Sequence, residues 1–515
     1  MKNILRLISV FILEIALIAG CELDLAPYDS LTVENLSLSD QGIESLANGC
    51  LMMMKENLSY SQGQEPDPRD RYVRHLNQLT EFPSDNLMIV KSTTDNLWYS
   101  FNMQHIPGQI NTTYIWFIGY KIILNANNII EGVDLNENTS NRVRHLLGEA
   151  YYYRAMVHFD LARIFSTPPS HGLDKAGIII RTGTSEDDLK ARATVGETYD
   201  QIISDLKKAA DLMTTRESNS SESIKYGSKW SALALLSRAY LYMEEWDSAV
   251  SYANKFIPDN PDYESQSPFE LETRENYVNS FWNSTQSSEA IFIFYFTPEE
   301  VHGEASIGSM YNAGPTGTEG WGEIFPSKPL RDLLATYRHD VRNNLIDTVF
   351  KDDGVTIKNY PTTLYPTFYI NKFSNQDGIV PLASPQYIRL SEMYLNRAEA
   401  YAHMGGHDNE ALADVNIIRQ RAGLTGDELV TTGNLASHGY TSVLDAVLNE
   451  RRLELAYEGF RRDDLLRNKI NLDRSFPSAQ NPTEGTDILP WDAPRQIYFI
   501  PVAETINNSA CEQNP

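Results

Sequence analysis

Residues 388–421, IRLSEMYLNRAEAYAHMGGHDNEALADVNIIRQR, contain the pattern that decides the fold class. They predict two antiparallel helices, over residues 388–404 and 410–421, because the adjacent glycines Gly405 and Gly406 interrupt an otherwise helix-forming sequence. Small and large residues alternate in both segments. This alternation is typical of tetratricopeptide-like hairpins, in which alanines let neighbouring helices approach closely.

Other segments repeat this helical signature. Residues 230–241 and 246–257 predict a second hairpin with a short turn. Residues 146–164 carry apolar side chains on two faces, which is typical of a buried helix. Thr194 and Glu197 have the spacing of a capping box and predict the start of the next helix. The sequence therefore predicts a mainly α fold, a tetratricopeptide-like scaffold of helical hairpins.

Two long regions differ from this scaffold in composition. Residues 60–113 are rich in Asn, Asp, Ser and Thr, and residues 258–385 combine a strand-like run, Ile291 to Phe296, with a glycine-rich segment. Six glycines fall from Gly303 to Gly322, too many for a stable helix. We expect loop-rich insertions containing a few short strands, and loops of that length in a compact protein usually carry function.

The first residues predict an exported, lipid-anchored chain. Lys2 and Arg6 precede a mainly apolar run, and small residues then lead into Cys21, as in a bacterial export signal. Leu17 to Cys21 resembles a lipobox, in which the cysteine is acylated after cleavage; an ordinary secreted protein is the alternative. The expected organisation is a signal peptide over residues 1–20 and one domain over 21–515, with its scaffold at about 114–257 and 386–470 and ligand-binding loop regions at about 60–113 and 258–385.

Composition excludes several classes of function. The formal charge of −26 repels phosphate backbones, so we expect no nucleic-acid partner. Apart from Cys21 only Cys50 and Cys511 remain, which makes neither a disulfide framework nor a metal cluster and leaves their pairing open. We expect no cofactor and no metal, with calcium among the acidic loops as an open alternative.

Several motifs occur in the order found in one known family. They are Cys21 to Pro27, the run EAYYYR at residues 149–154, IRLSEMYLNRAEA at 388–400, ERRLELAYEGFR at 450–461, and Ile500 to Ile506 before the terminal Gln513-Asn514-Pro515. Together they resemble the SusD/RagB family of outer-membrane nutrient-binding lipoproteins. One departure is Arg462-Asp463-Asp464, where family members commonly carry an aromatic residue.

The resemblance implies a function as well as a fold. It implies a surface-exposed lipoprotein of the outer membrane, acylated at Cys21, that binds a glycan without catalysis. It also implies a position as a lid on a TonB-dependent transporter barrel of the SusC type. Peptide binding of the RagB kind is one alternative; a lipid-anchored glycoside hydrolase and a tetratricopeptide scaffold that binds only protein are two others.

Charged residues on the predicted apolar helix faces have a structural interpretation. Arg451 shares a face with apolar neighbours, as do Glu392 and Glu399 on another helix. A buried ion must be paired, because desolvating a lone charge costs several kcal/mol. We therefore expect Arg451 to form an ion pair with Glu392 or Glu399.

The loop regions contain the residue types that sugars need, whereas motifs for catalysis do not occur. No Gly-x-Ser-x-Gly elbow, phosphate-binding glycine loop or His-Glu-x-x-His set is present. Carbohydrate binding requires flat aromatic faces with amides or carboxylates nearby. The candidates for ligand contact are Asn96, Trp98, Tyr99, Trp282, Tyr295, Tyr311 and Trp321. Trp230 and Trp246 lie on apolar helix faces and are assigned to the core.

Overall fold

The computed structural model describes residues 39–59, 67–90, 96–185, 189–213, 223–257, 267–361, 363, 365–476 and 488–515. Cys21 and the expected signal peptide lie outside the described residues. In the described part, no helix combines the length and the apolar character that a membrane crossing requires.

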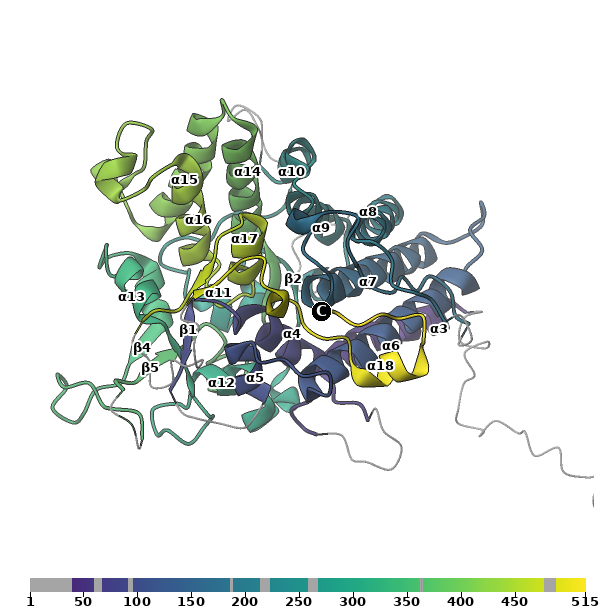
Figure 1. Ribbon diagram of the computed structural model, residues 1–515, viewed down its shortest axis with the longest axis horizontal. Coiled ribbons are helices and arrows are strands. Elements are labelled where there is room, and N and C mark those ends of the chain that lie inside the picture. The colour runs from purple at the N-terminus through teal and green to yellow at the C-terminus, as the bar shows by residue number, and fades with distance from the viewer. Residues whose placement is uncertain are drawn as a thin grey trace, which may run out of the picture.

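A continuous stack of helices forms the scaffold, as Figure 1 shows. Each helix packs against the next along the series α3, α6, α7, α8, α9, α10 and α14, and α15 and α16 both pack on α14. The bounds are α3 Asp40–Lys55, α6 Ile110–Gly132, α7 Asn141–Phe165, α8 Val195–Leu212, α9 Lys229–Tyr242, α10 Trp246–Ala253, α14 Leu390–Met404, α15 Asp408–Ala422 and α16 Val443–Glu454. The mainly helical class expected from the sequence is confirmed.

Local signals set several helix boundaries. Thr194 and Glu197 form the predicted capping box at the start of α8. Gly405 and Gly406 both have positive φ, 73° and 78°, and so end α14 before α15 begins. Glycine adopts this left-handed conformation without the steric cost that a Cβ atom incurs.

Short helices and two-stranded sheets make up the two insertions and the segment that follows α16. Much of the second insertion, coloured teal to green, lies at the lower left of Figure 1. All four sheets are antiparallel pairs: β1 with β3, β2 with β6, β4 with β5 and β7 with β8. The strands are β1 Leu87–Ile89, β2 Ala290–Ile293, β3 Ile324–Pro326, β4 Ile346–Thr348, β5 Phe368–Ile370, β6 Gln386–Arg389, β7 Leu472–Asp473 and β8 Ile488–Leu489. The short helices are α4 Tyr72–Glu81, α5 Asn96–Asn102, α11 Asn279–Trp282, α12 Ile307–Tyr311, α13 Lys328–Leu334, α17 Arg461–Arg467 and α18 Val502–Asn507.

Two boundaries differ from the sequence-based expectation. The helix expected from Ile388 begins at Leu390, because residues 386–389 form β6 and pair with β2. The region 60–113, expected to be loop, contains α4, and all ten residues of α4 are buried. Its polar side chains resemble a loop composition, but several form hydrogen bonds inside the protein: His75 with Gln78, Asn77 with the carbonyl of Tyr457, and Glu81 with the N–H of Gly459.

Buried ion pairs join the insertions to the scaffold. Arg389 contacts Glu289 and Glu454, each at 2.6 Å, and Arg342 contacts Glu450 at 2.6 Å. These side chains are almost completely buried, so each charge requires an opposite charge close by.

Arg451 takes part in a second buried cluster. Its side chain lies 3.1 Å from Glu399 and 3.0 Å from Asp464. Glu392 is not its partner: this carboxylate pairs with Arg238 of α9 at 2.7 Å. The expectation of an ion pair with Glu399 agrees with the structure, and the alternative with Glu392 is wrong because that residue faces a different helix.

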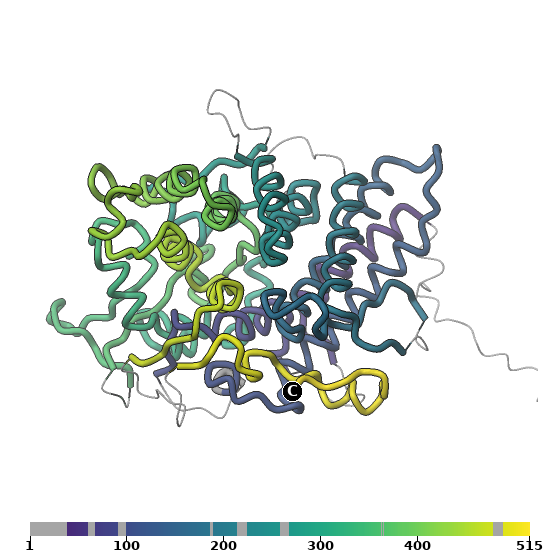
Figure 2. Tube along the Cα trace, turned by 45° about the horizontal axis from the view of Figure 1, so that its top comes forward, coloured from purple at the N-terminus to yellow at the C-terminus, as the bar shows by residue number. Residues whose placement is uncertain are grey.

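The tube view in Figure 2 shows that the C-terminal segment lies close to the N-terminal helices. Trp116 of α6 donates a hydrogen bond from Nε1 to Glu504 of α18 at 3.1 Å.

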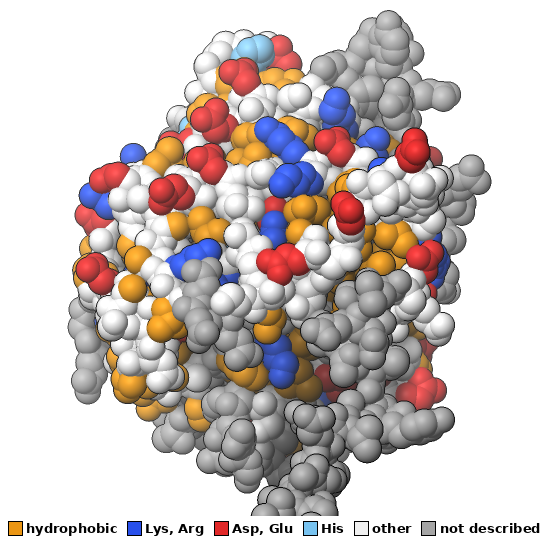
Figure 3. Space-filling model, turned by 90° about the vertical axis from the view of Figure 1, so that its right-hand side faces the viewer, with side chains coloured by type: hydrophobic (Ala, Val, Ile, Leu, Met, Phe, Trp, Pro, Cys, Tyr) orange, Lys and Arg blue, Asp and Glu red, His pale blue; other side chains and the backbone are white. Residues whose placement is uncertain are grey.

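Cys50 and Cys511 are both buried and both free thiols. Figure 3 shows one end of the molecule, where acidic and basic side chains are interspersed.

Candidate functional site

Helix α4 is the platform on which the short helices α5 and α12 pack. It contacts α5, α6 and α12, so it connects two insertions with the scaffold. The imidazole of His75 lies 2.9 Å from both Asp70 and Gln78. Asn111 of α6 donates hydrogen bonds to Gln78, at 3.3 Å, and to Ser100 of α5, at 2.9 Å. A buried network with its partners satisfied is rigid, so α5 is held in a defined place.

Tyr311 belongs to the core beneath this surface and does not present itself to a ligand. Its side chain is fully buried, and its hydroxyl donates a hydrogen bond to Asn77 Oδ1 at 2.5 Å. Burial raises the pKa of Tyr311 well above its ordinary value. The assignment of Tyr311 to the ligand contacts is therefore wrong. Tyr311 is the last residue of the short helix α12, which packs on α4.

Trp321 is presented to solvent by the glycine-rich segment. The side chain is 39% exposed. Its backbone N–H donates to Ser309 Oγ at 3.1 Å, and its carbonyl accepts from the Tyr360 hydroxyl at 3.1 Å. A Cβ at Gly320 would lie 2.3 Å from a backbone oxygen, and Gly322 has a φ of +53°. The two glycines thus allow the chain to fold tightly against α12 while the indole between them stays outside.

The remaining candidates lie in different surroundings. Trp282 is half-buried and donates from Nε1 to the carbonyl of Asn371 at 2.9 Å, in an apolar cluster around Tyr277. Tyr295 is half-buried, with Lys225 Nζ 3.9 Å from the centre of its ring. The structure therefore does not bring these two side chains together with Trp321.

Helix α5 contains the other three candidates. Tyr99 is half-buried. Asn96 and Trp98 belong to the same helix, but their side chains lie outside the described residues. Helix α5 itself packs on α4.

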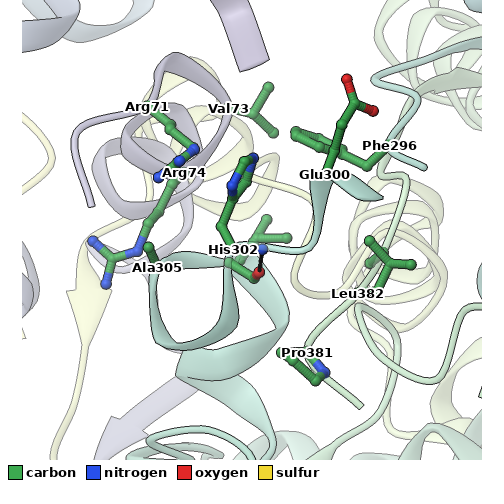
Figure 4. Close-up of a pocket in the computed structure, with 12 residues that line it drawn as sticks. Arg71, Val73, Arg74, Phe296, Glu300, His302, Ala305, Pro381 and Leu382 are labelled. Atoms are coloured by element: carbon green, nitrogen blue, oxygen red, sulfur yellow. Dashed lines mark hydrogen bonds between the residues drawn. The ribbon is translucent and has the colours of Figure 1, made fainter. Parts of the chain in front are cut away.

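A small cavity lies where α4 begins, and sequence patterns did not indicate it. Figure 4 shows its lining, with Arg71 and Arg74 from the start of α4, His302 from the following insertion, and Pro381 and Leu382. Its volume is about 20 Å³. In a polar segment these residues look like ordinary surface residues, so only their burial distinguishes them.

The cavity is lined by two buried arginines and by a histidine whose pKa is lowered. Arg71 is 6% exposed and Arg74 is 3% exposed. Burial lowers the pKa of His302 below its ordinary value, and the neighbouring Arg71 charge lowers it further. Both effects favour the neutral form of His302. Its ring meets Phe296 edge to face, with the centroids 6.1 Å apart.

The described residues contain no cluster of metal-binding side chains. Within the part of the chain that the structure describes, no group of three or more His, Cys, Asp or Glu side chains could hold a metal ion. This surface presents aromatic rings and hydrogen-bonding groups, which are suited to binding a ligand.

Comparison with known proteins agrees with this description. Residues 48–241 match a family model described as starch-binding and associating with the outer membrane, and residues 335–515 match the SusD family model. The SusD-like protein P2 of Formosa agariphila is 25% identical over 439 residues, which cover 80% of this chain and 81% of that protein.

Solved structures share the fold over nearly the whole chain. A SusD superfamily protein from Bacteroides thetaiotaomicron has a TM-score of 0.79 at 25% identity, with 93% of this chain and 100% of that chain covered. A putative sugar binding protein from Bacteroides vulgatus has a TM-score of 0.73 at 27% identity, covering 92% and 98%. SusD family proteins are non-catalytic binding proteins. The chain therefore belongs to the SusD/RagB family of outer-membrane nutrient-binding proteins.

Proposed function

We propose that the protein is a surface-exposed lipoprotein that captures an oligosaccharide and delivers it to a SusC-type TonB-dependent transporter. The observation that carries this proposal is the exposed Trp321, framed by two glycines on the insertion that packs over α4. An indole is a flat apolar surface that can cover the apolar face of a sugar ring.

The platform supports binding because it is ordered before the ligand arrives. Ser100 of α5 and Gln78 of α4 are linked through Asn111, and Trp321 is fixed through Ser309 of α12. A preordered site loses less conformational entropy on binding than a mobile one. We retain Trp98 and Tyr99 as candidates, because they belong to helix α5, which packs on α4.

Related proteins favour a sugar over a peptide. One similar structure is named a putative sugar binding protein, and another is named surface glycan-binding protein A from Bacteroides uniformis. The second shares only 19% identity with this chain and indicates the fold alone.

A lipid anchor would keep the protein at the membrane, close to its transporter. Acylation of Cys21 would tether the domain, at about 0.8 kcal/mol for each methylene buried in the membrane. A tether also raises the local concentration of the protein near its transporter, so a modest interface stays occupied. Energy for transport would come from the transporter.

Affinity electrophoresis against a panel of glycans and peptides tests the proposal. We expect glycan retardation that is lost in Trp321→Ala and reduced in Trp98→Ala. Trp246→Ala is the matched control, because Trp246 stacks on His403 of the scaffold at 4.2 Å and not on the platform. Retardation by peptides alone would favour the RagB-like alternative, and release of cleaved sugar would favour a hydrolase. Unchanged glycan binding in both variants would contradict the assigned site.

A further inference from the structure

Among the described residues, Arg71 lacks the close carboxylate partner that several other buried arginines have. Arg154, Arg238 and Arg451, for example, lie 2.7 to 3.0 Å from Asp205, Glu392 and Asp464, respectively. Arg71 is also buried, with 6% of its surface exposed. Within the described residues, however, its Nε and Nη1 atoms have no hydrogen-bond partner and no carboxylate lies within ion-pair distance.

Carboxylates do lie near Arg71, but other cations hold them. Asp67 pairs with Arg69 at 2.7 Å, and Asp70 lies 2.9 Å from His75. Glu300, which also lines the cavity, pairs with Lys55 at 2.6 Å.

The residual charge on Arg71 is therefore poorly compensated. Burial lowers the pKa of Arg71, and the more distant Glu56, Asp70 and Asp67 offset this effect only in part. A buried guanidinium without a close counter-charge destabilises a protein unless a ligand supplies one.

The cavity beside Arg71 limits what such a ligand can be. Figure 4 shows the Arg71 guanidinium and the His302 imidazole turned toward one another. His302 Nε2 is also buried and without a partner among the described residues. The other walls are largely apolar, formed by Val73, Phe296, Ile307, Pro381, Leu382 and Ala383. A volume of about 20 Å³ holds a small substituent and not a sugar ring.

We propose that this cavity receives an oxyanionic substituent of the captured glycan, either the carboxylate of a uronic acid or a sulfate ester. Arg71 would donate N–H groups from Nε and Nη1 to the oxyanion, and the neutral His302 would donate a third hydrogen bond from Nε2. The charge of Glu300, which also lines the cavity, is offset by Lys55. This inference rests on the proposed glycan binding and specifies the class of glycan.

Specificity follows from the same arrangement. Charge-assisted hydrogen bonds are roughly twice as strong as neutral ones. A neutral glycan would leave the donors of Arg71 unpaired, so we expect a preference of about tenfold or more for the charged form.

Isothermal titration calorimetry with matched ligands tests the proposal. The pairs are oligogalacturonate with its methyl ester, and a sulfated galactan oligosaccharide with its desulfated form. The first pair tests a carboxylate source and the second a sulfate source. The proteins are the wild type, Arg71→Met, Arg71→Lys, and Arg142→Met as a control at an exposed arginine near the start of α7.

We expect the wild type and Arg142→Met to bind one charged ligand at least about tenfold more tightly than its neutral partner. Arg71→Met should lose that preference while still binding the neutral form, and Arg71→Lys should retain part of it. Thermal unfolding should show Arg71→Met to be at least as stable as the wild type, because an uncompensated buried charge has been removed.

Three results would overturn the inference. These are equal wild-type affinity for both members of each pair, an equal loss of charged and neutral binding in Arg71→Met, and a marked loss of stability in that variant. Glycan binding without charge preference would leave the proposed function standing. Failure of the wild type to bind any oligosaccharide of a broad panel would contradict both.

Discussion

Replacing Arg451 by Met should damage folding and spare ligand binding. Arg451 is 1% exposed and donates from Nε and Nη2 to Asp464, each at 3.0 Å, and from Nη1 to Asn396, also at 3.0 Å. Its Nε also lies 3.1 Å from Glu399. Methionine fills similar space but supplies neither the charge nor the donors.

The magnitude follows from the charge balance of the cluster. Arg451 and Arg467 face Glu399 and Asp464, so two positive charges balance two negative charges. The variant leaves one buried negative charge uncompensated, which costs about 3 to 5 kcal/mol. Total folding free energies are about 5 to 15 kcal/mol, so the loss is a large fraction of the stability.

Acid sensitivity provides a second readout of the same cluster. Burial raises the pKa of Glu399, but the charges of Arg467 and Arg451 outweigh burial and hold the pKa at about 2. Because this pKa is depressed in the folded state, its contribution to stability is present above the ordinary value near 4.5 and is lost as pH falls toward 2. Removing Arg451 raises the Glu399 pKa, so this contribution should shrink in the variant.

Urea denaturation of the wild type, Arg451→Met, Glu399→Gln and the double variant measures the effect. We expect the double variant to lose less than the sum of the single losses, because it restores charge balance. Glycan affinity at a temperature where Arg451→Met remains folded should equal that of the wild type. Normal stability combined with lost binding would refute the structural role of Arg451.

Two further substitutions test buried features near α4. Burial raises the pKa of Glu81 to about 7, above its ordinary value of 4.5, although the N–H of Gly459 donates to its carboxylate. The folded state therefore binds the proton more tightly, and stability falls as pH rises from about 4.5 to 7. Glu81→Gln should abolish up to about 3 kcal/mol of that fall, measured by urea unfolding at pH 5 and pH 8; an unchanged pH dependence would contradict it. Gly459→Ala should lose more than about 1 to 3 kcal/mol, because φ is +80° and the new Cβ would lie 2.3 Å from Thr80 Oγ1. Gly405→Ala has similar strain, with a φ of +73°, but open space around it, so equal thermal-melting losses in the two variants would contradict the close contact.

Sequence periodicity predicted the scaffold well, because its helices are defined by local patterns. The capping box at Thr194 and the Gly405-Gly406 turn act over a few residues, and the structure confirms both. Strand β6 was missed because it exists only through pairing with β2, about a hundred residues earlier in the chain. Helix α4 was missed because its buried polar side chains look like those of a loop.

Candidate contacts were harder to predict than helices. Tyr311 and Trp321 share a glycine-rich neighbourhood in the sequence, yet one is fully buried and the other is 39% exposed. Their difference depends on how the segment folds back on α12, which composition does not reveal. Arg451 was correctly expected to need a partner, but Asp464 became apparent only from the packing of α17 near α16.

The most direct measurement is calorimetric titration of an oligosaccharide into wild-type protein and Trp321→Ala, followed by recovery of the sugar. We expect saturable binding by the wild type and intact sugar afterwards. The variant should unfold at the wild-type temperature and bind about tenfold or more weakly, since a stacked indole contributes on the order of 1.5 kcal/mol. Equal affinity in the two proteins, or a cleaved sugar, would contradict capture by an exposed aromatic surface without chemistry.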